Sequence, residues 1–411
     1  SQNTPIPRPE YPRPQFVREH WINLNGIWTC EFDHGRSGYD AGEMIKGGDD
    51  QKRSRRLWLS KGFAQPITVP FCPESTLSGI AHTDFIEQMW YHRKLEIPAD
   101  WTESILLHFG AVDYHCDAFI DGKLVGRHAG GQVGFCFDIA PFVTPGQVYD
   151  LVLMVRDDVR GYVQPSGKQS GAYHSHGCHY TRVTGIWQTV WMEPVSRFAI
   201  EDVQILPDLD RSAFHLIPVY RNLERDAMLR VKLLSEGRVV AEASMPQANG
   251  LPITLSVPEP KPWSPASPHL YDLELELCDA QGQALDAVRS YAGLRKIHIE
   301  GDRVFLNNEP LYQRLVLDQG YYPDGIWTAP SDDALKRDIE LSMAAGFNGA
   351  RLHQKVFEPR FHYWADKLGY LTWGEAASWG CNAASFEGRD NFLREWREIL
   401  LRDRNHPSII T

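Results

Sequence analysis

Three side chains with acid–base or hydrogen-bonding chemistry follow two predicted strands near the end of the chain. Arg351 and His353 lie at the end of the predicted strand Phe347–Leu352, and Glu375 follows the predicted strand Tyr370–Trp373. The carboxyl ends of parallel strands meet at one edge of a sheet, where such folds build their sites. A fixed arginine beside a carboxylate lowers the pKa of that carboxylate. Alternatively, Arg351 pairs with a structural acid and His353 caps a helix.

A second stretch carries side chains that bind metals in other proteins. The candidates are His174, His176, Cys178 and His179. Residues 174, 176 and 178 would share one face of an extended chain, and imidazole and thiolate groups are zinc ligands. No distant fourth ligand is evident in the sequence. We therefore predict that the protein holds no metal and needs no cofactor.

The elements that must position Arg351 and Glu375 alternate between strand and helix. The predicted strands are Tyr312–Leu317, Phe347–Leu352 and Tyr370–Trp373. Three helices are predicted: one that begins after Ser331, and two that span Glu358–Leu368 and Asn391–Arg404. Leu335, Ile339 and Met343 share one face of the first helix. Such alternation predicts a parallel sheet, and the (β/α)8 TIM barrel is the leading candidate. A complete barrel needs about 250 residues, more than the sequence holds after residue 297.

Two β regions precede this part of the chain. From about Trp21 to Pro194, short apolar runs are broken by Gly, Pro and Asp, a pattern typical of a β-sandwich. The runs include Ser104–Phe109, Cys116–Ile120 and Asp150–Val155, and the pair Asp121-Gly122 predicts a tight hairpin. The second region, residues 197–297, includes Met228–Leu234, Leu251–Val257 and Tyr271–Leu277. About seven strands there predict an immunoglobulin-like sandwich.

Composition limits the classes of function. A formal net charge of −11 argues against binding nucleic acid or an anionic membrane, because both need a basic face. No apolar run is long enough to span a bilayer. The seven cysteines, an odd number without paired spacing, favour reduced thiols, and the chain begins without a basic, apolar leader. We therefore expect a cytoplasmic protein, although a removed signal peptide would fit the same sequence.

Three motifs in order resemble glycoside hydrolase family 2, which holds β-galactosidases, β-glucuronidases and β-mannosidases. They are Thr184-Gly185-Ile186-Trp187-Gln188, then Lys261-Pro262-Trp263-Ser264-Pro265 with Pro268-His269-Leu270-Tyr271, then Phe347-Asn348-Gly349-Ala350-Arg351-Leu352-His353. The resemblance covers nearly the whole chain. It implies a jelly-roll, sugar-binding-like domain over residues 1–195, an immunoglobulin-like β-sandwich over 196–297, and an incomplete TIM-barrel catalytic domain over 298–411.

The resemblance implies a retaining β-glycosidase that hydrolyses O-glycosidic bonds of β-linked sugars. Such an enzyme needs an acid/base carboxyl and a nucleophilic carboxylate about 5 to 5.5 Å apart. In the family, the acid/base Glu follows strand four of the barrel and the nucleophile lies on strand seven. The strand-four signature begins at Arg404-Asn405-His406-Pro407. We therefore expect both catalytic glutamates beyond Thr411 and predict that the 411-residue chain alone is inactive.

The resemblance also assigns roles to residues of the sugar pocket. It implies that Arg351 holds the nucleophile ionised and that His353 hydrogen-bonds sugar hydroxyls, although Leu352-His353-Gln354-Lys355 replaces the family's commoner Ser-His-Tyr-Pro. Glu375 either holds a sugar hydroxyl or pairs with Arg351. Further candidates, each with a structural alternative, are Trp327, Trp373 and Trp379 for stacking on sugar, and Asp158, beside Asp157, for a first-domain loop that enters the pocket.

The alternative function is a noncatalytic carbohydrate-binding or scaffolding protein with a vestigial half barrel. A half barrel leaves an open strand edge, which folded proteins normally cover. This favours the glycosidase hypothesis and predicts that the open edge either pairs with a second copy of the chain or is poorly ordered. The expected partner is a carbohydrate substrate, and the sequence does not distinguish galactose, glucuronate and mannose.

Overall fold

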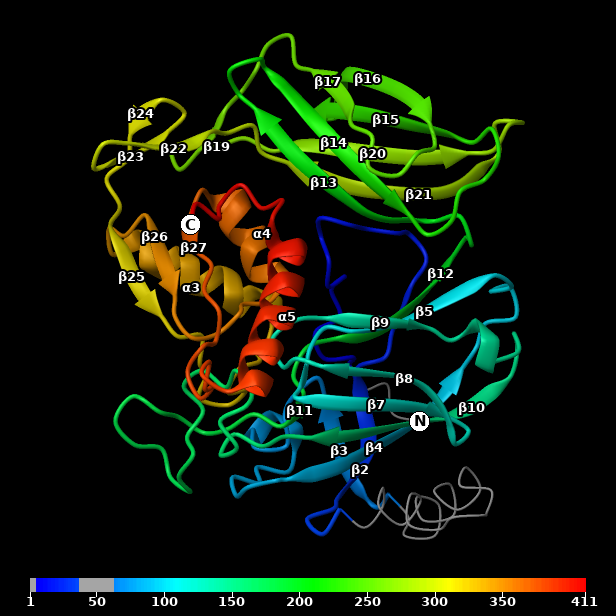
Figure 1. The fold of residues 1–411 in the computed structure, drawn as a ribbon, viewed down its shortest axis with the longest axis vertical. Coiled ribbons are helices and arrows are strands. Elements are labelled where there is room, and N and C mark those ends of the chain that lie inside the picture. Colours follow the sequence, from blue (N-terminus) through cyan, green and yellow to red (C-terminus); the bar gives the residue numbers. More distant parts are fainter. Residues whose placement is uncertain (1–4, 37–62) are drawn as a thin grey trace.

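The computed structural model describes residues 5–36 and 63–411. Residues 1–4 and 37–62, which belong to the first predicted domain, lie outside the described part. Figure 1 shows two β-sandwiches, with a smaller α/β part between and beside them. No helix within the described ranges is both long and apolar enough to cross a membrane.

The first sandwich consists of two antiparallel sheets that enclose one hydrophobic core. One sheet has the order β1 (Ile22–Asn23), β12 (Val190–Val195), β5 (Ser104–Phe109) and β9 (Phe135–Asp138). The other has the order β3 (Gln65–Val69), β2 (Gly26–Phe32), β4 (Gln88–Glu96), β10 (Val148–Arg156), β7 (His115–Ile120) and β8 (Lys123–Ala129). Two short strands, β6 (Val112–Asp113) and β11 (Gly185–Ile186), pair separately, and η1 (Thr76–Ser78) and η2 (Ala140–Phe142) are single 3-10 turns.

The sequence predicted parts of this sandwich closely because the signals are local. The predicted run Ser104–Phe109 is β5, and Asp121-Gly122 joins β7 to β8. Both turn residues have positive φ, +47° at Asp121 and +79° at Gly122, as the two-residue hairpin requires. The hairpin prediction is therefore confirmed.

The second sandwich contains seven strands in two antiparallel sheets. They are β13 (Ile200–Asp208), β14 (Ala213–Tyr220) and β17 (Ile253–Ser256) on one side, and β16 (Arg238–Pro246), β15 (Met228–Ser235), β20 (Tyr271–Cys278) and β21 (Ala284–Ala292) on the other. In β20, Leu273, Leu275 and Leu277 are buried, and the residues between them are exposed. This alternation places one face of the sheet in the core and leaves the other in water.

Small strands connect this sandwich to the α/β part. They are β18 (Trp263–Ser264), β19 (Ser267–Pro268), β22 (Ile297–Glu300), β23 (Arg303–Leu306) and β24 (Glu309–Pro310). The indole N–H of Trp263 donates to the backbone oxygen of Asp366 at 2.8 Å, which joins the connecting segment to the α/β part.

The α/β part has a parallel sheet of β25 (Leu315–Asp318), β26 (Gly349–Leu352) and β27 (Leu371–Trp373). Its helices are α3 (Asp332–Ala344), α4 (Pro359–Leu368) and α5 (Phe386–Asp403). Next to β27, Ile410 N donates to Thr372 O at 3.0 Å, in a parallel pairing that continues the order of the sheet. The predicted parallel alternation is confirmed over these three strands.

The helix ends follow from capping. The predicted cap Ser331 accepts a hydrogen bond from Ala334 N, and α4 ends at Gly369 with φ +76°. Helix α5 begins five residues before the prediction because Ser385 caps it by accepting from Gly388 N. Leu335 and Ile339 are buried on one face of α3, whereas Met343, at the same spacing near the end of the helix, is 36% exposed.

Candidate functional site

Arg351, His353 and Glu375 meet at the carboxyl ends of β26 and β27. Arg351 lies opposite Trp373 in the parallel register, and Glu375 follows two residues after that tryptophan. Arg351 Nε donates to Glu375 Oε2 at 2.6 Å, and His353 Nδ1 lies 2.6 Å from Glu375 Oε1. The three side chains that the sequence placed at strand ends therefore form one cluster.

This cluster holds an ionised carboxylate at a partly open surface. Partial burial alone would raise the pKa of Glu375, but the hydrogen bonds from Arg351 and His353 hold that pKa below its ordinary value. The Arg351 side chain is 46% exposed, whereas that of His353 is 12% exposed. The pairing of Glu375 with Arg351 is one of the two roles predicted for this acid. Its carboxylate and the exposed guanidinium can also hydrogen-bond a polar ligand.

Gln354, which the sequence argument did not single out, fixes the relative positions of this cluster and the following loop. Its amide nitrogen donates to Glu375 Oε1 at 3.3 Å and to Ser378 Oγ at 3.1 Å. Its amide oxygen accepts from Trp379 N at 2.8 Å. Gln354 is buried and has a positive φ of +61°, a conformation that few non-glycine residues adopt and that clusters at functional sites. A positive φ is invisible in the sequence.

Trp379 is the exposed aromatic residue beside the cluster. Its side chain is 37% exposed, and its ring packs edge-on against His353 with centroids 5.5 Å apart. The flat indole face could stack on the C–H groups of a sugar ring. Among the three predicted stacking residues, Trp379 is the one whose exposure fits that role.

A long connection from the first sandwich holds this tryptophan in place. The segment between β10 and β11 extends to the strand ends of the parallel sheet, as Figure 1 shows. Ser166 N and Gly167 N donate to Trp379 O at 2.9 and 3.0 Å, and Lys168 Nζ lies 5.0 Å from the Trp379 ring centroid. His179 packs on the same ring at 5.6 Å. The first sandwich therefore forms one wall of the candidate site.

The close approach of Gly167 to Gln354 gives a test of this docking. A Cβ at Gly167 would lie 2.1 Å from the main-chain oxygen of Gln354, and neither backbone can yield easily. Gly167→Ala is therefore expected to displace the connection, so that the amides of Ser166 and Gly167 exchange their hydrogens at least about ten-fold faster. Amide hydrogen exchange measures this change.

Gly177→Ala is the matched control for this substitution. Gly177 has a similar φ, +53° against +61° at Gly167, but nothing lies within 4 Å of an added Cβ. Both variants carry a similar backbone strain, of about 1–2 kcal/mol, because alanine must adopt a left-handed conformation. Equal exchange in the two variants would contradict the proposed docking.

The other two predicted stacking residues make contacts within the protein. Trp327 is 1% exposed and packs on Trp187 with centroids 5.0 Å apart, so the prediction that it stacks on a sugar is wrong. Trp373 is half-buried, and its indole N–H donates to Gln313 at 2.6 Å. Sequence alone does not separate core tryptophans from exposed ones, because large aromatic side chains serve both in cores and at binding surfaces.

Asp158 is exposed and makes local contacts. It accepts a hydrogen bond from Arg160 N at 3.2 Å, and its own N–H donates to Gln164 at 3.4 Å. The neighbouring Asp157 is buried, and burial raises the pKa of Asp157 to about 7. The predicted loop does reach the candidate site, but through residues 166–168 and 179. The prediction for Asp158 itself is not supported by its position.

The histidine-rich stretch lies at the exposed tip of the same connection. The rings of His176 and His179 stack at 5.2 Å, and Cys178 Sγ lies 4.0 Å from His179 Nδ1. His174 is exposed and packs edge-on against Tyr173. In the described part of the chain, no three His, Cys, Asp or Glu side chains group together so as to hold a metal ion.

Lys355 is a second residue that sequence reasoning missed. Burial lowers the pKa of its ammonium to about 8, and Nζ donates to the backbone oxygens of Gly320 and Trp327 at 2.6 and 2.7 Å. Nζ also lies 5.5 Å from the Trp187 ring centroid. Lys355 therefore joins the loop after β25 to the strand end that carries Arg351 and His353.

The motif that starts at Asn405 is anchored by a buried acid. Asp366, which is fully buried, accepts from Ser408 N at 2.9 Å and lies 2.7 Å from His406 Nδ1. Asn405 hydrogen-bonds the backbone of β13 through both ends of its amide, to Val203 O and Ile205 N. These contacts fix the path of the chain as it pairs alongside β27.

Comparison with known proteins identifies the family. The model described as "Glycosyl hydrolases family 2, sugar binding domain" matches residues 55–192, and "Glycosyl hydrolases family 2" matches residues 198–295. Together the two models match more than half of the chain. The chain belongs to glycosyl hydrolase family 2.

Individual relatives agree in fold and differ in the sugar that they are named for. A β-glucuronidase from Paenibacillus borealis is 24% identical over 97% of this chain and 68% of its own length. A β-galactosidase from Photobacterium profundum is 23% identical over 94% of this chain but only 39% of its own length. A solved β-glucuronidase from Ruminococcus gnavus, in complex with D-glucuronic acid, has a TM-score of 0.80 at 22% identity, covering 98% of this chain and 68% of that one. The chain thus spans between 39% and 68% of the length of these proteins.

Proposed function

We propose that this chain is the part of a retaining β-glycosidase that binds and surrounds the sugar. The observation that carries the proposal is the cluster of Arg351, His353 and Glu375 at the carboxyl ends of parallel strands, beside the exposed Trp379. Charged and polar groups at that edge, next to an aromatic face, suit a ligand with many hydroxyls and an apolar ring face. The names of the relatives, β-glucuronidase and β-galactosidase, support a β-linked sugar as substrate.

In this proposal the parallel part is the beginning of a (β/α)8 barrel, within the domain of residues 298–411. The order β25, β26, β27, and the parallel pairing next to β27, support a sheet that grows in one direction, as barrels do. The remaining two domains span residues 1–195 and 196–297.

In this mechanism the residues of this chain position the sugar. Two carboxyl groups that follow Thr411 cleave the glycosidic bond. Retaining hydrolysis needs an acid/base and a nucleophile about 5 to 5.5 Å apart. Glu375 is held ionised by Arg351 and His353, which suits binding of a hydroxyl or support of a neighbouring acid rather than proton donation. We propose that both catalytic glutamates follow Thr411 in sequence, and that Arg351 keeps the nucleophile ionised by its charge.

Hydrolysis of nitrophenyl β-glycosides tests this proposal. Protein of residues 1–411 is expected to release no nitrophenol from the β-galactoside, β-glucuronide or β-mannoside. A coding sequence that continues in frame after Thr411 is expected to contain an Asn-Glu pair, and the longer product is expected to be active. Arg351→Met in that product is expected to lower kcat by a factor on the order of 10² or more, the size of losing one preorganised electrostatic contact.

Two results would contradict the proposal. One is hydrolysis by residues 1–411 that Arg351→Met abolishes, because the catalytic carboxylates would then lie within this chain. The other is a longer product that binds β-linked sugars but hydrolyses none of them, which would favour a noncatalytic carbohydrate-binding protein. Arg303→Met, at an exposed position in β23, is the matched control for the loss of an arginine.

A further inference from the structure

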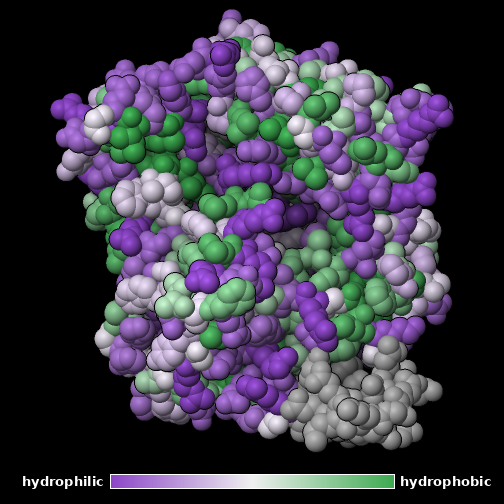
Figure 2. All heavy atoms as spheres, viewed as in Figure 1, coloured by the Kyte–Doolittle hydropathy of each residue, from purple (hydrophilic) through white to green (hydrophobic). Residues whose placement is uncertain are grey.

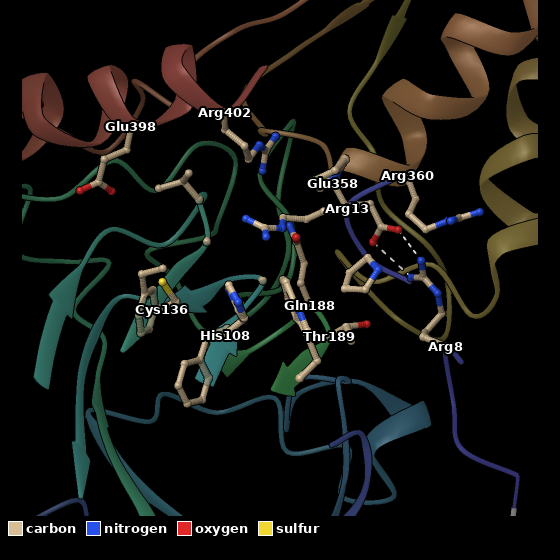
Figure 3. A pocket seen from close by; sticks show the side chains of 18 of the residues that line it. Arg8, Arg13, His108, Cys136, Gln188, Thr189, Glu358, Arg360, Glu398 and Arg402 are labelled. Atoms are coloured by element: carbon tan, nitrogen blue, oxygen red, sulfur yellow. Dashed lines mark hydrogen bonds and ion pairs between the residues drawn. The ribbon is translucent and has the colours of Figure 1, made fainter. Parts of the chain in front are cut away.

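A separate cavity lies where three parts of the chain meet. It has a volume of about 300 Å³ and is bounded by the N-terminal segment, by β5, β9 and β12 of the first sandwich, and by α4 and α5. Figure 2 shows a molecular face that is hollowed near its middle, below the second sandwich, and Figure 3 shows the cavity from close by. None of Arg351, His353, Glu375 and Trp379 lines it.

The walls of this cavity are largely apolar and aromatic. Phe135, Trp191 and Leu401 line it from β9, β12 and α5. The His108 ring stacks on Trp191 with centroids 4.6 Å apart and an interplanar angle of 5°, which makes a flat wall. Burial lowers the pKa of His108 to about 4, so this wall carries no charge at neutral pH. A largely apolar pocket of this size, with a few convergent polar groups, is typical of small-molecule sites.

The carboxylates that line the cavity are already paired. Both oxygens of Glu358 accept from the guanidinium of Arg8, and Glu398 Oε2 lies 2.9 Å from His128 Nε2. Arg8 also donates to Glu10 through Nε at 2.6 Å. Each carboxylate of the wall therefore already has an arginine or histidine partner within the chain.

The polar atoms without a partner are all N–H donors. Within the described residues that line the cavity, the buried atoms that lack an acceptor are Arg13 Nε, Gln188 Nε2, Trp191 Nε1 and Arg402 Nη1. Arg402 uses its other nitrogens on Asp403 and on Phe357 O, so Nη1 is the one left over. Figure 3 shows Arg13 and Arg402 reaching toward the same space from the N-terminal segment and from α5. A buried donor without an acceptor is unfavourable, so this wall favours a ligand that supplies acceptors.

We propose that the cavity binds a small aromatic carboxylate. The ring lies against Phe135 and the Trp191–His108 wall, and the carboxylate accepts hydrogen bonds from Arg13 and Arg402. Hydrogen bonds between guanidinium and carboxylate are stronger than neutral ones, and burial of the ring adds the hydrophobic contribution. This site goes beyond the proposed glycosidase function and does not depend on it.

Benzoate and benzyl alcohol, titrated into the 411-residue protein, test this proposal. The two probes share a ring and differ in charge. Benzoate is expected to bind saturably by calorimetry, to change the intrinsic tryptophan fluorescence and to raise the Tm. Benzyl alcohol is expected to bind at least ten-fold more weakly. Saturable binding of benzoate no tighter than that of benzyl alcohol, or no binding to folded protein, would overturn the proposal.

Variants locate the binding to this cavity. Arg13→Met is expected to weaken benzoate at least ten-fold and to leave benzyl alcohol unchanged, because it removes the charge and keeps the bulk. Leu401→Trp, at a side chain that lines the cavity and is 43% exposed, is expected to fill the space and abolish both. Leu393→Trp is the matched control, since Leu393 lies on the same helix, is 57% exposed and does not line the cavity. Unchanged benzoate binding by Leu401→Trp would overturn the assignment.

Discussion

Replacing Arg18 by methionine is expected to lower the free energy of unfolding by about 3–5 kcal/mol, the usual cost of removing one partner from a buried ion pair. Arg18 is buried and serves two acids at once. It donates to both oxygens of Asp286 at 3.0 and 2.9 Å, and to Glu193 at 3.1 Å. Glu193 lies on β12 of the first sandwich and Asp286 on β21 of the second. Arg18→Met therefore leaves two buried carboxylates without their shared cation.

Urea unfolding at pH 7 measures this effect. Burial alone would raise the pKa of Glu193, but the hydrogen bond with His108 and the charges of Arg13 and Arg18 hold it at about 2. Glu193 is therefore ionised at pH 7, and its negative charge loses the Arg18 partner in Arg18→Met. Arg211→Met is the control, because the Arg211 side chain is 82% exposed and pairs with Asp208 at the surface. Such surface pairs contribute about 0–1 kcal/mol. A loss below 1 kcal/mol for Arg18→Met would contradict the interpretation of this contact.

Replacing Glu395 by glutamine is expected to flatten the pH dependence of stability. Glu395 projects from α5 into the first sandwich, where its Oε1 accepts from Gln132 N at 2.7 Å and its Oε2 has no partner among the described residues. Burial raises the pKa of Glu395 to about 8. The folded chain therefore keeps a proton that the unfolded chain releases near the ordinary value of about 4.3.

The sign of this effect follows from proton binding. Between about pH 4.3 and pH 8 the folded state binds more protons than the unfolded state, so the free energy of unfolding falls as the pH rises. One such group contributes a slope of about 1.4 kcal/mol per pH unit. Glu395→Gln removes that slope, so the variant gains stability relative to the wild type as the pH rises toward 8.

Urea unfolding at pH 5, 6, 7 and 8 measures the difference. Glu387→Gln is the matched control, since it makes the same substitution at an exposed position on α5. The difference in slope between the two variants isolates the contribution of burial. Parallel pH profiles for Glu395→Gln and the wild type would show that Glu395 is not protonated in the folded chain at neutral pH.

The strands and helices that the sequence predicted well carry their signals in neighbouring residues. The alternation in β20, the Asp121-Gly122 turn and the Ser331 cap each depend on a few adjacent side chains, and each matches the structure. The start of α5 was missed because Ser385 was not recognised as its cap. Met343 shares the spacing of Leu335 and Ile339 but is exposed, because helical periodicity does not show where a neighbouring element ends.

The candidate site was predicted in part for the same reason. Strand ends placed Arg351, His353 and Glu375 at one edge of a sheet, and the structure brings them into contact. Their partner Gln354 was not predicted, because its role depends on a positive φ and on contacts with a later loop. The burial of Trp327 was equally hidden, since it depends on the packing of Trp187 from the first sandwich.

The sequence by itself determined the order of the elements, the family motifs and the strand ends at which polar groups gather. These features depend on local periodicity, turn residues and spacing. Only the tertiary structure decided that Glu375 bridges Arg351 and His353, and that residues 166–168 of the first sandwich hold Trp379. It also decided that α5 buries Glu395 and borders a cavity with Arg13. These contacts join segments far apart in the chain, and close packing of whole elements sets them.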